Sequence, residues 1–137
     1  MTEEIKDSEW DRFCADFSRL LSGSLVTIET IDPENVHREV AREIPFDGIS
    51  MDHSDACNDV LTIRASQEGQ RRLEEQVIEP IHIIARRKPD GAKVLEIVGE
   101  LGETLIHFHS GTWPERFTER RQSQPQPQPF ASAAAMA

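Results

Sequence analysis

The sequence lacks the hydrophobic segments that membrane insertion and export require. No run of about 18 consecutive apolar residues occurs in the 137-residue chain. The N-terminal stretch from Met1 to Asp7 has neither the basic start nor the apolar run of a secretory signal peptide. These absences predict a cytoplasmic protein that does not engage a membrane.

Basic residues are scarce relative to acidic ones. The chain has 15 Lys and Arg against 25 Asp and Glu, which leaves a formal net charge of −10 at pH 7. A field of this sign repels the phosphate backbone, whose neutralisation supplies most non-specific affinity for nucleic acids. We therefore expect no binding to DNA or RNA.

Cysteine is also rare, with Cys14 and Cys57 as the only two. They lie far apart, form no C-x-x-C motif and come without a secretion signal, which favours reduced thiols over a disulfide framework. Cys14 falls on the apolar face of a predicted helix, where a cysteine acts as a small core residue.

Recognised catalytic motifs are missing. The sequence contains no G-x-S-x-G nucleophile elbow, and none of its seven glycines forms G-x-G-x-x-G or a Walker loop. The sequence therefore indicates neither nucleophilic catalysis nor a phosphate-binding loop. These absences favour a protein that is not an enzyme.

The clearest element that is present is an amphipathic helix over residues 8–22. Ser8 is a suitable N-cap, and Gly23 is placed to end the helix. Apolar residues recur at helical spacing and define one buried face: Trp10, Phe13, Cys14, Phe17, Leu20 and Leu21.

Beyond this helix the pattern changes to short runs rich in β-branched residues. Predicted strands cover residues 25–29, 39–44, 48–51, 59–64, 81–87, 92–100 and 103–109. We interpret residues 67–76 as a loop because of Gly69 and the nearby Pro80. The fold class is α+β, with the N-terminal helix packed on a curved antiparallel sheet of about six or seven strands in one domain, residues 1–117.

Turn chemistry allows a register to be predicted for the last hairpins. A two-residue turn at Asp90-Gly91 places Ile84 opposite Ile97, and a turn at Leu101-Gly102 places Glu96 opposite His107. The face expected to be buried then carries Ile84, Leu95, Ile97, Ile106 and Phe108.

The remaining residues, 118–137, alternate Gln with Pro before an Ala-rich end. Proline at every second position removes backbone donors and favours extended chain, so this segment is predicted to be a disordered tail. We expect Trp113, just before the tail, to fold back and close one end of the sheet.

The order of these landmarks resembles a small bacterial family of domains of unknown function, number fifty-three thirty-five. The resemblance covers about residues 8–110. It is carried by Trp10-Asp11-Arg12-Phe13, Phe17-Ser18, Val26-Thr27-Ile28-Glu29, Asp47-Gly48-Ile49-Ser50, Ile78-Glu79-Pro80, Leu95-Glu96-Ile97 and Leu105-Ile106-His107-Phe108. It implies a small α+β protein with no established activity, and it transfers no site residues.

The sharpest candidate site combines Glu96, His107 and His109. Residues 107 and 109 point to the same side of a strand, and the predicted register sets Glu96 beside them. Two imidazoles and a carboxylate suit a divalent metal with an open position, or a base oriented by a carboxylate. The same arrangement is also an ordinary cross-strand charge pair.

A second cluster, residues 52–59, gathers three carboxylates, an imidazole and a thiol. It lacks the ligand spacing of an EF-hand or a zinc motif, so we interpret it as a solvated hairpin loop.

These observations favour a non-enzymatic interaction or accessory module that binds a protein partner through its sheet face or tail, with no cofactor. One alternative is a small metal-dependent or acid/base enzyme that uses Glu96, His107 and His109. A further alternative is a carrier that holds a small ligand in an apolar cavity behind Ile84, Ile97, Ile106 and Phe108.

Overall fold

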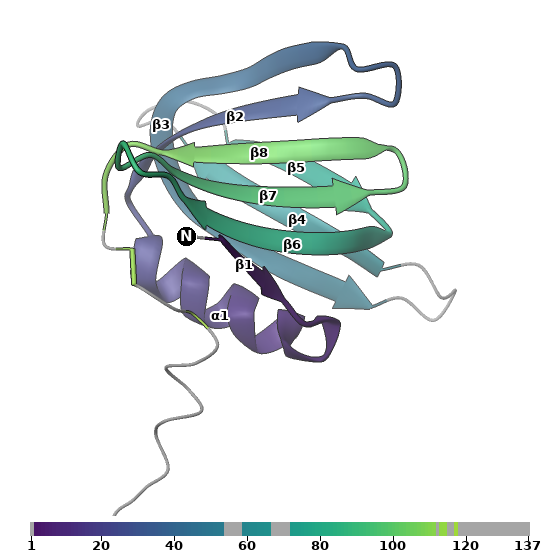
Figure 1. Cartoon of the computed structure of the whole chain (residues 1–137), viewed down its shortest axis with the longest axis horizontal. Coiled ribbons are helices and arrows are strands. Elements are labelled where there is room, and N and C mark those ends of the chain that lie inside the picture. Colours follow the sequence, from purple (N-terminus) through teal and green to yellow (C-terminus); the bar gives the residue numbers. More distant parts are fainter. Residues whose placement is uncertain (1, 54–58, 67–71, 112, 115–116, 118–137) are drawn as a thin grey trace, which may run out of the picture.

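The computed structural model describes residues 2–53, 59–66, 72–111, 113, 114 and 117. Within these residues one helix packs on an eight-stranded antiparallel sheet with the strand order β1-β6-β7-β8-β2-β3-β4-β5 (Figure 1). The elements are β1 (Thr2–Ile5), η1 (Asp7–Glu9), α1 (Trp10–Leu21), β2 (Leu25–Ile31), β3 (His37–His53), β4 (Asp59–Ser66), β5 (Arg72–Ile78), β6 (Pro80–Arg87), β7 (Lys93–Gly99) and β8 (Gly102–Phe108). No helix in this part of the chain is long and apolar enough to cross a bilayer.

The sheet has more strands than the six or seven expected, because two were missed. β1 pairs with β6, and β5 pairs with β4. The prediction of a loop over residues 67–76 was wrong from Arg72 onwards. In β5 the inward positions are Leu73, Glu75 and Val77, so a glutamate interrupts the alternation that would have indicated a strand.

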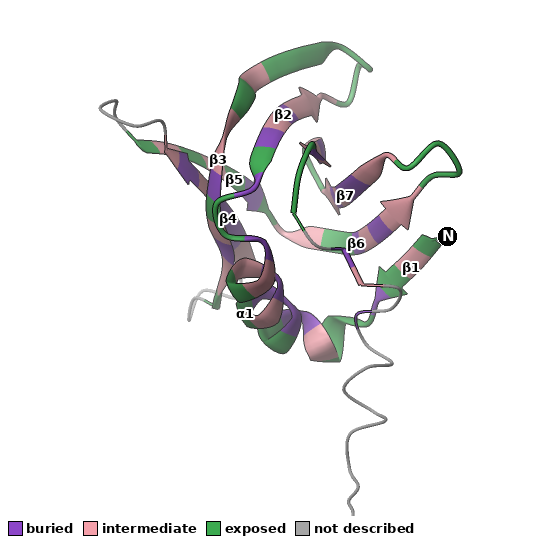
Figure 2. Cartoon of the chain, turned by 90° about the vertical axis from the view of Figure 1, so that its left-hand side faces the viewer, coloured by how far each residue is buried: buried purple, intermediate pink, exposed green. Residues whose placement is uncertain are grey.

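β3 joins two segments that the sequence predicted as separate strands, residues 39–44 and 48–51. Its first half pairs with β2 and its second half with β4, with register shifts that mark β-bulges. Bulges bend a strand and increase its twist. The sheet therefore curls on itself, and its β5 edge lies across from β7 (Figure 2).

Both predicted hairpin registers were wrong. The turn after β6 has three residues, since the Lys88 N–H donates to Ala92 O, and it sets Ile84 opposite Glu96. Ile83 is consequently fully buried, and Ile84 lies on the other face. The next turn consists of residues 100 and 101, because Gly99 pairs with Gly102. The prediction of burial is confirmed for Leu95, Ile97, Ile106 and Phe108.

The predicted apolar face of the helix is confirmed. Trp10, Phe13, Cys14, Phe17 and Leu21 are buried, and Leu20 packs partly buried against them. The expected N-cap at Ser8 was wrong, because the 3-10 turn η1 precedes α1 and Glu9 occupies the N-cap position. Gly23 follows the helix with φ of +89°, as a C-terminal stop requires.

Aromatic rings form the centre of the core beneath the helix. Phe17 lies 5.9 Å from Phe46, 5.4 Å from Phe108 and 5.7 Å from Trp113, measured between ring centroids. Trp113 is 8% exposed, which confirms that it folds back at the end of the sheet. The predicted tail, residues 118–137, lies outside the described residues.

Candidate functional site

The structure does not bring Glu96 to His107. Glu96 lies opposite Leu105, and its Oε1 accepts a hydrogen bond from Arg86 Nε at 2.8 Å. The expected Glu96–His107 pair was therefore wrong, because the turn after β7 falls one residue earlier than predicted and shifts the register. His107 lies on β8 and His109 just beyond its end, and both line one groove.

A different carboxylate, Glu29 on β2, takes the place expected for Glu96. Its Oε1 is 3.3 Å from His107 Nε2, and its Oε2 is 2.9 Å from His37 Nδ1. The hydrogen bond from His37 lowers the pKa of Glu29; burial opposes this shift, and the hydrogen bond from His107 adds to it. Beside this group, His109 Nε2 is hydrogen-bonded to Thr27 Oγ1 at 2.8 Å.

We call Thr27, Glu29, His37, His107 and His109 the outer histidine cluster. A shallow groove of about 350 Å³ runs beside it and is also lined by acidic and basic side chains of β3. Within the described ranges, no set of three or more His, Cys, Asp or Glu residues lies close enough to hold a metal ion. As arranged, the cluster is a hydrogen-bonded network on a half-exposed surface.

The second predicted cluster is described only at its ends. His53 Nε2 is 2.8 Å from Asp11 Oδ1, and His53 Nδ1 is 2.9 Å from Asp59 Oδ1. The hydrogen bond to Asp11, followed by that to Asp59, raises the pKa of His53. This imidazole therefore ties the start of α1 to the β3–β4 hairpin, while residues 54–58, including Cys57, lie outside the described residues.

Cys14 is buried and free. Desolvation by burial, followed by the charge of Asp11, raises the pKa of its thiol to about 12. The thiolate is the reactive form of cysteine, so this side chain serves packing and not chemistry.

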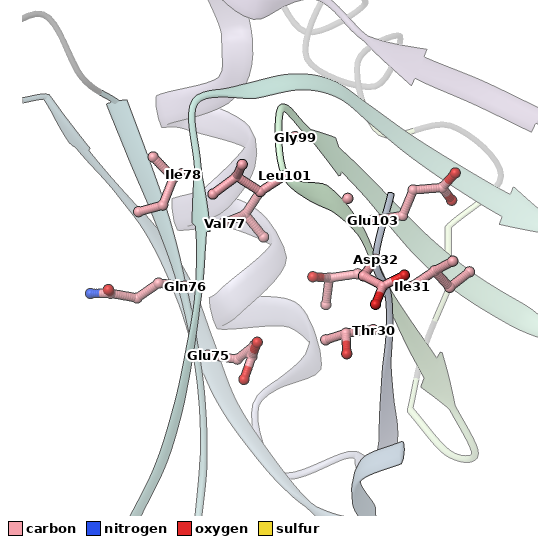
Figure 3. Close-up of a pocket in the computed structure, with 12 residues that line it drawn as sticks. Thr30, Ile31, Asp32, Glu75, Gln76, Val77, Ile78, Gly99, Leu101 and Glu103 are labelled. Carbon is pink, nitrogen blue, oxygen red and sulfur yellow. The ribbon is translucent and has the colours of Figure 1, made fainter. Parts of the chain in front are cut away.

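A cavity of about 170 Å³ opens at the end of the curled sheet that lies away from α1. We call it the open-end cavity (Figure 3). One wall is β5, from Glu75 to Ile78. The facing wall is formed by the end of β2 and by the β7–β8 hairpin, with Thr30, Ile31, Asp32, Gly99, Leu101, Gly102, Glu103 and Thr104.

Glu75 projects from β5 across this cavity towards Thr30, whereas its neighbour Gln76 points away (Figure 3). Burial raises the pKa of Glu75, and desolvation is the sole cause of that shift. No described residue forms a hydrogen bond or ion pair with its carboxyl group. A ligand that supplies a positive charge or a hydrogen-bond donor would stabilise the carboxyl group in this position.

Thr104 lines the same cavity from β8. It is only 4% exposed, and its hydroxyl group has no hydrogen-bond partner among the described residues. Its direct cross-strand neighbours are Thr30 on β2 and Ile97 on β7. Two threonines from adjacent strands therefore line the same cavity as Glu75.

This cavity was not predicted from the sequence. Glu75 fell in a segment predicted as a loop, and Thr104 is an unremarkable residue of a half-buried strand. The one available signal was a glutamate at an inward position of an otherwise alternating run, Leu73-Glu74-Glu75-Gln76-Val77. The carrier hypothesis expected a cavity behind Ile84, Ile97, Ile106 and Phe108. Aromatic rings pack against Phe108, and Ile84 lies on the other face of the sheet.

The chain belongs to the family described as "Family of unknown function (DUF5335)", whose sequence profile matches residues 1–116. This confirms the resemblance inferred from the sequence. No curated protein and no solved structure was found to match the chain.

Proposed function

We propose that this member of the family is a non-enzymatic binding module and that the open-end cavity is its binding site. The observation that carries the proposal is the hydroxyl group of Thr104, which is buried, lines the cavity and has no partner among the described residues. Buried polar groups in native proteins are nearly always hydrogen-bonded, and an orphaned one calls for an explanation.

The energetic argument concerns both polar groups of the cavity. A buried hydroxyl without a partner destabilises a protein by about 1–3 kcal/mol. The carboxyl group of Glu75 is also held where its charged form is disfavoured. A ligand that satisfies both groups recovers these costs on binding, and that recovery is a source of affinity and orientation.

The position of the cavity also suits a binding role. It lies between the edge strand β5 and the β7–β8 hairpin, and Leu101 at the tip of that hairpin is 69% exposed. A partner that inserts a group between β5 and the hairpin would contact residues far apart in sequence. This gives the expected interaction module a definite surface at one end of its sheet.

The test is a binding screen read by protein NMR. A set of small fragments that includes cationic, neutral and anionic members is added to the ¹⁵N-labelled protein. We expect at least one fragment to cause saturable shifts at Thr104, Val77 and Gly102, and Thr104→Val to weaken its binding.

The matched control is Thr62→Val, which removes the other buried threonine hydroxyl of the described residues and lies outside the cavity lining. If no fragment of any class shifts the lining residues, the open-end cavity is not a binding site.

A second candidate function is acid/base or metal-dependent chemistry at His107 and His109, with Glu29 in the role expected for Glu96. In the arrangement described, these side chains do not form a three-ligand metal site, so the metal-dependent form requires them to move. It is favoured by the contacts of Glu29 with two imidazoles beside a groove. Native mass spectrometry with one equivalent of Zn²⁺ tests it. If the unaltered protein retains one ion per chain and the variant with His107 and His109 replaced by Ala does not, the result favours this function. If the unaltered protein and the variant retain the ion equally, the result contradicts it.

A further inference from the structure

All charged side chains around the open-end cavity are acidic. Glu75 lies within it, and Asp32 and Glu103 stand at its rim. A shallower hollow on the other side of the β7–β8 turn is lined by Asp32, Glu103 and also Glu100. Neither lining set contains a lysine, arginine or histidine, so the field at the mouth is negative in a chain whose net charge is already −10.

This charge arrangement limits what can bind. An anion would meet the carboxyl groups of Glu75, Asp32 and Glu103 with no cation among the lining residues, since the charges of Arg86 and His37 act on Glu103 from outside the lining. Like charges at short range are costly. A neutral ligand would leave the carboxylate of Glu75 desolvated and unpaired. A cation removes that penalty, since an opposite charge nearby favours the ionised carboxylate.

The oxygen acceptors of the cavity match the donors of an ammonium group in number. Thr30 on β2 and Thr104 on β8 are direct cross-strand neighbours, and Glu75 points across the cavity towards Thr30 (Figure 3). One carboxylate and two hydroxyls supply three acceptors, and an ammonium group has three donors. A guanidinium group, with five donors in a plane, would leave some of them unpaired.

Other cations fit less well. Calcium takes six to eight oxygen ligands, often from several carboxylates. At the rim, the carboxylate of Asp32 already accepts the N–H groups of Glu34 and Val36 at 2.9 Å each. Both N–H groups bond the Oδ1 atom of Asp32, and Glu103 is hydrogen-bonded to Glu96. Among the lining carboxyl groups, Glu75 is therefore the one without a hydrogen-bond partner among the described residues.

The wall beside these oxygens is apolar. Val77 is buried on β5, Ile78 follows it, and the exposed Leu101 lines the same cavity from the β7–β8 turn (Figure 3). An alkyl stem attached to the ammonium group would cover these side chains, and its burial adds to affinity in proportion to the apolar area removed from water.

We propose that the open-end cavity binds a primary alkylammonium group, as carried by the lysine side chain of a partner protein or by a free alkylamine. The inference rests on the proposed function and specifies its ligand. Glu75 pairs with the charge, the hydroxyls of Thr30 and Thr104 accept the remaining N–H groups, and Val77 and Leu101 cover the alkyl stem.

The experiment titrates the full-length ¹⁵N-labelled protein with n-butylammonium chloride at constant ionic strength and follows the lining residues. Titrations with 1-butanol and sodium butyrate serve as neutral and anionic comparisons. We expect saturable shifts with n-butylammonium alone. Glu75→Gln should weaken that binding by roughly tenfold or more, as expected for the loss of a charged hydrogen bond.

The matched control is Glu74→Gln on the same strand. Glu74 is exposed and bonded to Arg64 at 3.2 Å, away from the cavity. Glu74→Gln makes the same charge change, and its affinity should stay within about twofold of that of the unaltered protein. A melting temperature of Glu75→Gln that is no lower than that of the unaltered protein then shows that its loss of affinity is not a loss of folding.

Two further titrations test whether the ammonium group comes from a partner's lysine or a free amine, and whether the cavity binds calcium instead. Tighter binding of N-acetyl-lysine N-methylamide than of n-butylammonium supports a partner's lysine, and weaker binding supports a free amine. Binding of CaCl₂ that depends on Glu75 without binding of n-butylammonium overturns the ammonium assignment. Binding of 1-butanol as tight as that of n-butylammonium also overturns the ammonium assignment, but it leaves the proposed binding function intact. The binding function itself is decided by the fragment screen alone.

Discussion

Gly99 on β7 lies directly against Val77 on β5: a Cβ atom at position 99 would be 2.7 Å from Val77 Cγ1 and 3.0 Å from the carbonyl oxygen of Ile78. These two strands are not neighbours in the sheet order. The contact therefore marks the place where the curled sheet meets its own edge. Because both residues line the open-end cavity, this close approach sets the distance between its walls.

Gly99→Ala should force β5 away from β7. Overpacking of this kind lowers the free energy of unfolding by about 1–3 kcal/mol. Urea denaturation followed by tryptophan fluorescence measures the change. Glu100→Ala, in the exposed turn next to Gly99, is the control and should change stability by less than about 0.5 kcal/mol. Equal stability of the two variants would contradict the close approach.

Thr104→Val should stabilise the protein while it weakens ligand binding. Removing a buried hydroxyl that has no partner recovers its desolvation penalty, so we expect the free energy of unfolding to rise by about 1 kcal/mol. A higher urea midpoint with an unchanged slope is the expected result.

Thr62→Val is the companion variant, because Thr62 is 6% exposed and its hydroxyl also has no partner among the described residues. It should raise stability without affecting ligand binding. Loss of stability in Thr104→Val would indicate that its hydroxyl is satisfied within the fold, which would remove the observation that carries the proposed function.

Trp113→Ala should be strongly destabilising, although Trp113 follows the last strand of the sheet. Its ring centroid is 5.7 Å from Phe17 and 5.5 Å from Phe108. Truncating a buried tryptophan typically costs about 3–5 kcal/mol. Thermal unfolding by circular dichroism measures the effect, with Val36→Ala in the exposed β2–β3 turn as the control. A small effect would show that the core does not need the segment after β8.

His53 should titrate above its usual pKa of about 6.5, because the carboxylates of Asp11 and Asp59 favour the imidazolium. A pKa that is raised on folding contributes stability that is fully present below about pH 6.5 and is lost as the pH rises through the folded-state value. NMR titration of the ring protons measures the pKa of His53.

Asp11→Asn should move the pKa of His53 back towards its usual value and flatten the pH dependence of stability in this range. A pKa of His53 at or below 6.5 in the unaltered protein would contradict the two contacts.

The sequence by itself determined the helix, the buried positions of β7 and β8, and the family. The spacing of apolar residues predicts these features. Phe13 and Phe17, four residues apart, share one face of the helix, and Leu95 and Ile97, two residues apart, share one face of a strand. Such patterns need no knowledge of what packs against them, and they are insensitive to a shift between paired strands.

Only the tertiary structure decided which polar residues meet. A turn displaced by one residue placed Leu105 opposite Glu96, and the pairing of β2 with β8 brought Glu29 to His107 across 78 positions of sequence. The cavity with Glu75 and Thr104 likewise exists because bulges in β3 curl the sheet until β5 approaches β7 at Gly99. Strand pairing and sheet curvature arise from turn geometry and long-range packing, and neither is encoded in the local pattern of residues.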